Sequence, residues 1–155
     1  MNKTDSIRPY APSDKEAVLE LIRLNTPTFF AHEEEEELAY YLENQREEYY
    51  VVELDGKIVG SGGINYSKDK TIGFLSWDAI LPDFQRNALG TKLVQFRLGI
   101  LNNLEKIEVI KVRTSQFAYA FYKKHGFRLI EVVEDHWSEG YDLYELEQIP
   151  QHDKM

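Results

Sequence analysis

Cysteine is absent from the 155 residues of this chain. A chain without cysteine cannot form disulfides, use a thiol nucleophile or bind a metal through thiolates. The four histidines have no metal-ligand spacing either, so we expect no metal. A reducing compartment, the cytoplasm, is the expected location.

Long apolar runs and basic residues are also scarce. No apolar stretch approaches membrane-spanning length, and the N-terminal residues lead into no signal-peptide apolar region, so no membrane association is expected. There are 18 lysines and arginines against 27 acidic residues, a net charge of −9. This balance disfavours nucleic-acid binding and suits a cationic substrate.

The remaining composition is that of a folded protein, with 43% hydrophobic and 13% aromatic residues. The length predicts one domain over 1–155, with 151–155 as a loose tail. Periodicity and turn residues predict, in order, a strand at 7–10, a helix capped by Ser13 and ended by Pro27, a helix at 33–46, a hairpin of 49–54 and 57–60 around Asp55-Gly56, a strand at 71–81, a helix at 89–104, a strand at 107–113, a helix at 116–125 and strands at 127–133 and 142–146. The acidic run at 33–37 is either a rim that attracts substrate or a solvated helix face.

The junction after the strand at 71–81 has the pattern of an anion site. An apolar strand stops at Pro82-Asp83, and helical spacing then resumes. The first N–H groups of a helix lack internal partners and attract phosphate, and Arg86 and Lys92 add positive charge. An ordinary strand-to-helix connection is the alternative. A nucleotide-triphosphate loop is excluded by residue order, and the glycines at 60–63 are expected inside a strand.

A second segment, 115–127, ends a helix at Gly126 and places Tyr122 one turn after Ala118. Together with the loop Gln85-Arg86-Asn87-Ala88-Leu89-Gly90, it resembles the GNAT superfamily of N-acetyltransferases. That family carries a Gln/Arg-x-x-Gly-x-Gly/Ala loop and an Asn-x-x-Ala-x-x-x-Tyr-x-x-x-Gly-Phe segment. Two positions depart from the pattern. Ala88 replaces the first loop glycine, so the loop must be helical there or lose cofactor affinity, and Gln116 is taken as the replacement for the asparagine.

The resemblance implies an α/β fold, with a mixed, mostly antiparallel twisted sheet flanked by helices. It also implies acetyl-coenzyme A as cosubstrate, without a metal, held between splayed central strands. The backbone of Ile80 and Leu81 would pair with the pantetheine arm, and Gln116 would lie near the arm. The pyrophosphate would be bound by the loop residues Gln85, Arg86, Asn87, Ala88, Leu89, Gly90 and Thr91.

Acetyl transfer to an amine needs a base for the amine proton and a group that assists the departing thiolate. Tyr122 matches the family position for that acid, although a tyrosine is more often a core ring. Asp78 is the candidate base, with a structural ion pair as its alternative reading. Other candidates for the base are His136, Glu139 and Asp142. Trp137 and Tyr141 are expected either to line the acceptor pocket or to pack on an edge strand.

The resulting prediction is an N-acetyltransferase that moves an acetyl group from acetyl-coenzyme A to a primary amine by direct attack. The acceptor is a small molecule or a peptide. The alternative is a noncatalytic acyl-coenzyme A-binding or interaction module, suggested by Ala88 and the uncertain base. An exposed final strand favours a homodimer.

Overall fold

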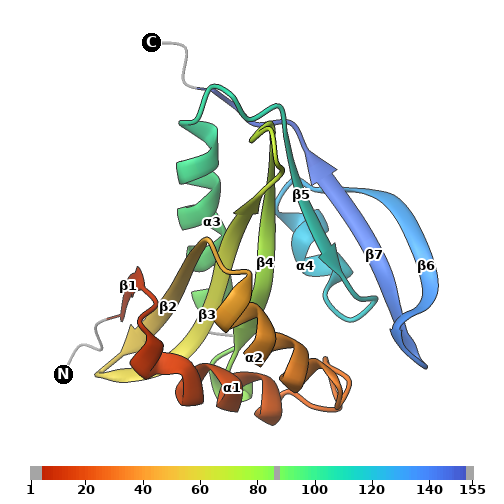
Figure 1. The fold of residues 1–155 in the computed structure, drawn as a ribbon. Helices are drawn as coiled ribbons and strands as arrows, with labels where there is room; N and C mark the ends of the chain where they lie inside the picture. The colour runs from red at the N-terminus through yellow and green to blue at the C-terminus, as the bar shows by residue number, and fades with distance from the viewer. Residues whose placement is uncertain (1–4, 86–87, 153–155) are drawn as a thin grey trace.

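A computed structural model describes residues 5–85 and 88–152 of the chain (Figure 1). The elements are β1 (Asp5–Pro9), the 3-10 turn η1 (Pro12–Asp14), α1 (Lys15–Leu24), α2 (Glu34–Asn44), β2 (Glu48–Leu54), β3 (Lys57–Tyr66), β4 (Ile72–Ile80), the 3-10 turn η2 (Pro82–Phe84), α3 (Leu89–Asn102), β5 (Val109–Thr114), α4 (Tyr119–Lys124), β6 (Arg128–Ser138) and β7 (Tyr141–Gln148).

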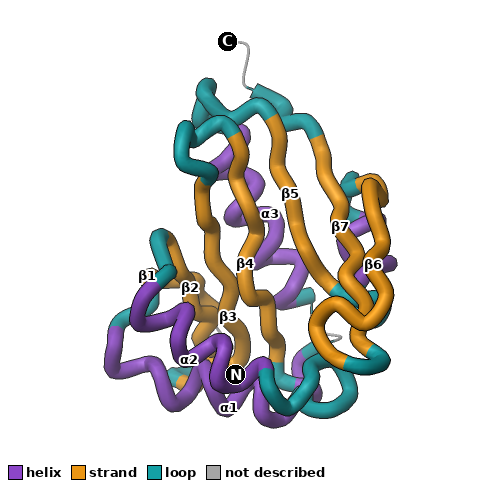
Figure 2. The backbone as a smooth tube through the Cα atoms, turned by 45° about the vertical axis from the view of Figure 1, so that its right-hand side comes forward, coloured by secondary structure: helices purple, strands orange, loops and turns teal. Residues whose placement is uncertain are grey.

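The strands form one sheet in the order β1-β2-β3-β4-β5-β7-β6. Neighbouring strands are antiparallel except β4 and β5, which are parallel. Helices α1 and α2 cover one face of the sheet, and α3 and α4 lie on the other (Figures 1 and 2). The predicted fold class, a mixed and mostly antiparallel sheet flanked by helices, is confirmed.

Local sequence explains the best-defined elements. Asp55 and Gly56 both have positive φ, 52° and 81°, which is the tight turn that twisted antiparallel strands require. The inward stripe of α1, including Val18 and Ile22, packs with Leu38 of α2 and Val51 of β2 in a buried cluster. These contacts attach the first two helices to the sheet.

The start of α1 differs from the prediction. Ser13 is not its cap, because Asp14 performs that task for the preceding turn. Its carboxylate accepts the Ala11 N–H at 2.8 Å and pairs with Arg8 at 2.8 Å. The Asp14 carboxylate makes both an ion pair and a charge-assisted hydrogen bond to the backbone. These stabilise the turn more than a neutral hydrogen bond from the Ser13 hydroxyl would.

Several predictions about the C-terminal half also need correction. The helix expected from 116 begins at Tyr119, and β6 continues to Ser138 through a stretch expected to be a connection. The final strand, β7, lies between β5 and β6, so the two edges of the sheet are β6 and β1. A homodimer therefore stays a prediction, but the exposed strand that favours it is β6 and not the final strand.

The tail that is expected to be loose makes hydrogen bonds in its first two residues. Gln151 donates its N–H to the Asn102 side chain at 2.9 Å, and His152 Nε2 lies 2.9 Å from the Ile107 carbonyl. Residues 153–155 fall outside the described part. No helix in residues 5–85 and 88–152 is long and apolar enough to cross a membrane.

The feature that creates the candidate site is the separation of β4 from β5. The two strands pair only from Ile72 to Leu75 with Val109 to Val112, and the rest of β4 has no partner on that side among the described strands. A register shift opposite Gly62 gives Trp77 a φ of 53° and distorts β4 at the point of separation. The glycines at 60–63 lie inside β3, as predicted.

Candidate active site

A cavity of about 790 Å³ occupies the space between β4 and β5. Its lining includes Gly90 at the start of α3 on one side of the sheet and Tyr41 of α2 on the other. Tyr122 and Asp78 contribute to the lining where β4 bends. The cavity therefore connects the predicted cofactor loop with the face covered by α2.

The start of α3 supplies the predicted anion cradle. Lys92 N bonds to the Ala88 carbonyl at 3.0 Å, which leaves the Leu89, Gly90 and Thr91 amides in the first turn without helical i−4 acceptors. Such amides favour anions. Arg86 and Asn87 lie outside the described residues. The Lys92 ammonium, expected beside the cradle, instead pairs with Asp5 at 2.7 Å.

Ala88 does not have the expected helical backbone. It has φ 61° and ψ 12°, the left-handed conformation, as the N-cap of α3. The left-handed geometry costs an alanine about 1–2 kcal/mol. The requirement for a glycine-like backbone thus persists although the glycine itself is missing.

Hydrogen bonding separates Ile80 from Leu81. The Leu81 N–H donates to the Val59 carbonyl at 2.8 Å, so this N–H is not free to pair with the pantetheine arm as expected. Backbone groups alternate along a strand, so the Ile80 N–H points toward the opening beside β4. The Ile80 carbonyl accepts the Asn25 amide at 2.9 Å and the Gln85 amide at 3.3 Å.

Gln116 is also placed differently. Its carboxamide donates to the Gly140 carbonyl at 2.8 Å and accepts the Asp142 N–H at 2.9 Å, which fixes the β6–β7 turn. Counted back from Ala118, the asparagine of the family pattern falls on Ser115 rather than Gln116. Ser115 lines the cavity, whereas Gln116 does not.

The two predicted catalytic residues share one hydrogen-bond network with a buried arginine. Arg97 of α3 is fully buried and binds both Asp78 oxygens, at 2.5 and 2.7 Å. It also donates to the Gly63 and Leu93 carbonyls. The phenol of Tyr122 donates to Asp78 Oδ2. A Cβ on Gly62 would lie 2.6 Å from Asp78 Oδ1, so only glycine leaves room for this network.

The network changes the chemistry expected of both residues. Asp78 compensates a buried cation, which agrees with the ion-pair alternative and argues against Asp78 as the base. Burial and the charge of Asp78 raise the pKa of Tyr122 well above its ordinary value. A phenol of that kind stays neutral and acts as a hydrogen-bond donor more readily than as an acid.

The other candidates for the base do not line the cavity. The carboxylate of Asp142 accepts the Asp135 N–H at 2.9 Å, and His136 and Glu139 are exposed at the β6–β7 hairpin. Trp137 does line the cavity and donates its indole N–H to the Thr114 carbonyl at 3.1 Å. Tyr141 donates its hydroxyl to the Pro27 carbonyl at 2.6 Å and holds the hairpin against the α1–α2 connection.

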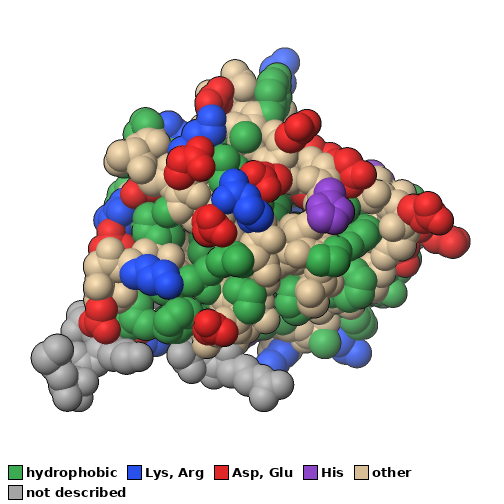
Figure 3. Space-filling view, turned by 90° about the horizontal axis from the view of Figure 1, so that it is seen from below, with side chains coloured by type: hydrophobic (Ala, Val, Ile, Leu, Met, Phe, Trp, Pro, Cys, Tyr) green, Lys and Arg blue, Asp and Glu red, His purple; other side chains and the backbone are tan. Residues whose placement is uncertain are grey.

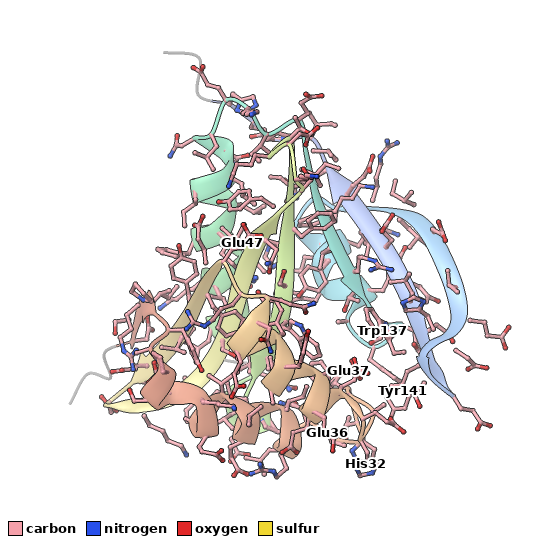
Figure 4. The ribbon with its side chains drawn as sticks, viewed as in Figure 1. His32, Glu36, Glu37, Glu47, Trp137 and Tyr141 are labelled. Carbon is pink, nitrogen blue, oxygen red and sulfur yellow. The ribbon has the colours of Figure 1, made fainter. Side chains whose placement is uncertain are left out.

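Sequence reasoning missed Glu47 and Arg97, and it included Glu34 only within the acidic run at 33–37. Burial raises the pKa of Glu34 to about 7, although its carboxylate accepts the Ala31 N–H at 2.7 Å. Glu47 lies at the opposite end of α2 and, like Glu34, contributes to the cavity lining (Figure 4). Arg97 left a signal, because it occupies the apolar stripe of α3 four residues after Leu93.

Comparisons with known proteins agree with this geometry. The model of the Acetyltransferase (GNAT) family matches residues 16–127, so the chain belongs to that family. An N-alpha-acetyltransferase of Sulfurisphaera tokodaii is 26% identical over 154 residues and 89% of each chain. Ard1 from Thermoplasma volcanium has a similar fold, with a TM-score of 0.78 at 18% identity over 94% of this chain and 97% of that one. An aminoglycoside 6'-N-acetyltransferase complexed with coenzyme A has a TM-score of 0.74 at 16% identity over 93% and 96% of the two chains.

Proposed function

We propose that this protein transfers an acetyl group from acetyl-coenzyme A to a primary amine inside the cavity between β4 and β5. The observation that carries the proposal is the parting of two parallel strands directly beside the N-terminus of α3. The same opening thereby presents the unpaired backbone of a strand and the free amides of the first turn of a helix. The unpaired strand backbone can pair with the extended arm of a ligand, and the amides can bind its phosphates.

The residues present fit such a cosubstrate. The amides of Leu89, Gly90 and Thr91 would bind the pyrophosphate, and the Ile80 N–H would pair with the pantetheine arm. Gly90 has no side chain in the way, and a Cβ there would already lie 3.3 Å from the Phe121 ring. When bound, acetyl-coenzyme A supplies an activated thioester.

Tyr122 would donate a hydrogen bond to the departing sulfur. Its hydroxyl now faces Asp78, and rotation about the C–O bond would turn it into the cavity. Because burial and Asp78 keep this phenol neutral, it would stabilise the thiolate without giving up its proton. Arg97 and Asp78 hold the ring in place.

Thiol release from acetyl-coenzyme A with a panel of primary amines, corrected for hydrolysis, tests this function. Tyr122→Phe keeps the ring and removes only the donor. We expect its turnover to fall by about 10²-fold with little change in cofactor affinity. Full turnover by the Phe variant would remove Tyr122 from the mechanism. If no amine of the panel increased thiol release above hydrolysis, the transferase activity would be refuted.

A noncatalytic acyl-coenzyme A-binding module is the second candidate. It is favoured by the pairing of Asp78 with Arg97 and by the strained backbone of Ala88. Cofactor binding in calorimetry, without thiol release for any amine, would select it.

A further inference from the structure

The cavity continues past Tyr122 to the face covered by α2, where its lining is aromatic and acidic. A stripe of side chains on α2 runs along this part of the cavity and continues at Gln45, the C-cap residue of the helix. Its members at helical spacing are Glu34, Glu37, Tyr41 and Gln45. Glu34 and Gln45 are eleven residues apart, about 16 Å along the helix axis. Both residues line the cavity, as does Glu47 beyond them.

The carboxylates on this side lack counter-ions. No ion pair joins Glu34, Glu37 or Glu47 to a lysine or arginine within residues 5–85 and 88–152, whereas Glu35 of the same helix pairs with Arg23 at 2.8 Å. Glu34 is only 6% exposed. Burial and the neighbouring Glu33 also raise the pKa of Glu37. Glu37 and Glu47 are exposed to solvent, so only Glu34 is an uncompensated carboxylate in a dry part of the cavity. Together the three negative charges favour a cationic occupant.

The walls between the two ends suit the apolar and cationic parts of such an occupant. Tyr66, Trp77 and Trp137 line the cavity, and aromatic faces attract ammonium groups. Lys70 lies over the Tyr66 ring at 5.3 Å and Arg113 over the Trp137 ring at 5.9 Å, so one face of each of these two rings already has a cation. Figure 4 shows Glu37 opposite Trp137 and Tyr141, with Glu47 toward the other end of α2. Acidic side chains also lie beside exposed hydrophobic ones at the end of the molecule seen in Figure 3.

The other charged side chains of the lining have charged partners. Asp78 is paired with Arg97, and Arg113 lies 3.5 Å from Glu145, a carboxylate that it shares with Lys111 at 3.7 Å. The acidic excess therefore comes from Glu34 and Glu47, reinforced by Glu37 at the mouth.

We propose that the acceptor is an aliphatic di- or polyamine, whose reacting nitrogen lies near Tyr122 while a second ammonium group is held by Glu47. Tyr41 and Tyr66 border this position. Glu34 and Glu37 add negative potential at the other end and favour longer, more highly charged acceptors. This inference rests on the proposed acetyl transfer and specifies its substrate class.

The central variant is Glu47→Gln. Glu47 Oε1 accepts the Tyr66 N–H at 3.0 Å and the Asn65 amide at 3.2 Å. A glutamine oxygen can keep both bonds, so the substitution removes the charge and little else. Glu34→Gln likewise preserves the acceptor for the Ala31 N–H. Glu43→Gln is the matched control, because Glu43 belongs to the same helix but pairs with Lys15 of α1.

The first assay compares 1,5-diaminopentane with 1-aminopentane, which has the same carbon chain and one amine fewer. We expect kcat/KM for the diamine to exceed that for the monoamine by at least about tenfold. Each single cavity variant should lower that ratio about threefold and the double variant about tenfold, while Glu43→Gln should leave it unchanged. Half-molar salt should reduce the ratio in the unmodified protein.

A second assay measures binding of the diamine and of the monoamine by calorimetry to protein saturated with coenzyme A, and so does not depend on turnover. Binding that Glu34→Gln and Glu47→Gln weaken supports the acceptor class even if no thiol is released, an outcome that would refute only the transferase. Equal treatment of the two amines in both assays overturns the acceptor class and leaves acetyl transfer standing. A ratio that Glu43→Gln lowers as much as Glu47→Gln also overturns it, because general charge would then explain the preference.

Discussion

Replacing Asp78 with asparagine distinguishes the two roles that this residue could have. The side chain keeps its shape, but the buried guanidinium of Arg97 loses its only charged partner among the described residues. The bonds from Arg97 to the Gly63 and Leu93 carbonyls remain. If Asp78 is structural, the main loss is therefore in stability.

The expected loss follows from the burial of this pair. Arg97 is 0% exposed, and the Asp78 side chain is 18% exposed. Removing one partner of a buried ion pair costs about 3–5 kcal/mol, and partial exposure of Asp78 points to the lower end of that range. For a chain of this length, a loss of about 3 kcal/mol lowers Tm by about 6–12 °C.

Thermal unfolding of four proteins tests this reasoning: the unmodified chain, Asp78→Asn, Arg97→Met and the double variant. Because the double variant leaves no buried charge, its loss should be well below the sum of the two single losses. Additive losses, or a fall in Tm of less than about 3 °C for Asp78→Asn, would refute the ion pair. A stable Asp78→Asn protein with abolished turnover would restore Asp78 as the base.

Three further predictions concern Ala88, the first turn of α3 and the acceptor side. Ala88→Gly should relieve the left-handed backbone and leave cofactor affinity equal or higher, with Tm unchanged or raised; a lower Tm would contradict the observed φ of 61°. Gly90→Val should weaken binding of coenzyme A in calorimetry, while Gly99→Val, on the same helix with no atom near its Cβ position, should not. Because the folded pKa of Glu34 is raised from 4.5 to about 7, the folded state binds more protons than the unfolded state in this range. The free energy of unfolding should therefore fall as pH rises from about 4.5 to 7, and Glu34→Gln should flatten the decrease in Tm between pH 5 and 8.

Turn residues made much of the fold predictable, because their backbone requirements are local. Asp55-Gly56 specified the hairpin of β2 and β3, and Gly126, with a φ of 92°, ended α4 as expected. Strand order is set by contacts between distant segments. The placement of β7 inside the sheet therefore could not be inferred from its own sequence.

The cofactor loop was predictable as a strand, turn and helix, but not in its hydrogen bonding. Leu81 and Ile80 have similar side chains, and only the pairing with Val59 decides which N–H faces the opening. The position expected for Gln116 differs from the structure for another reason. A one-residue error in matching the family pattern gave an amide side chain to the cavity, where the structure has Ser115.

Arg97 could have been identified from the sequence, and it would have changed the interpretation of Asp78. An arginine one turn after Leu93 and one turn before Leu101 lies on the buried stripe of its helix, and a buried guanidinium requires a nearby acid. Asp78, on the distorted and partly buried strand β4, supplies that acid. The same carboxylate then sets the state of Tyr122, because its charge disfavours ionisation of the phenol. Asp78 is thus committed to Arg97 and Tyr122, and the proton of the attacking amine must pass to water or to another group that lines the cavity.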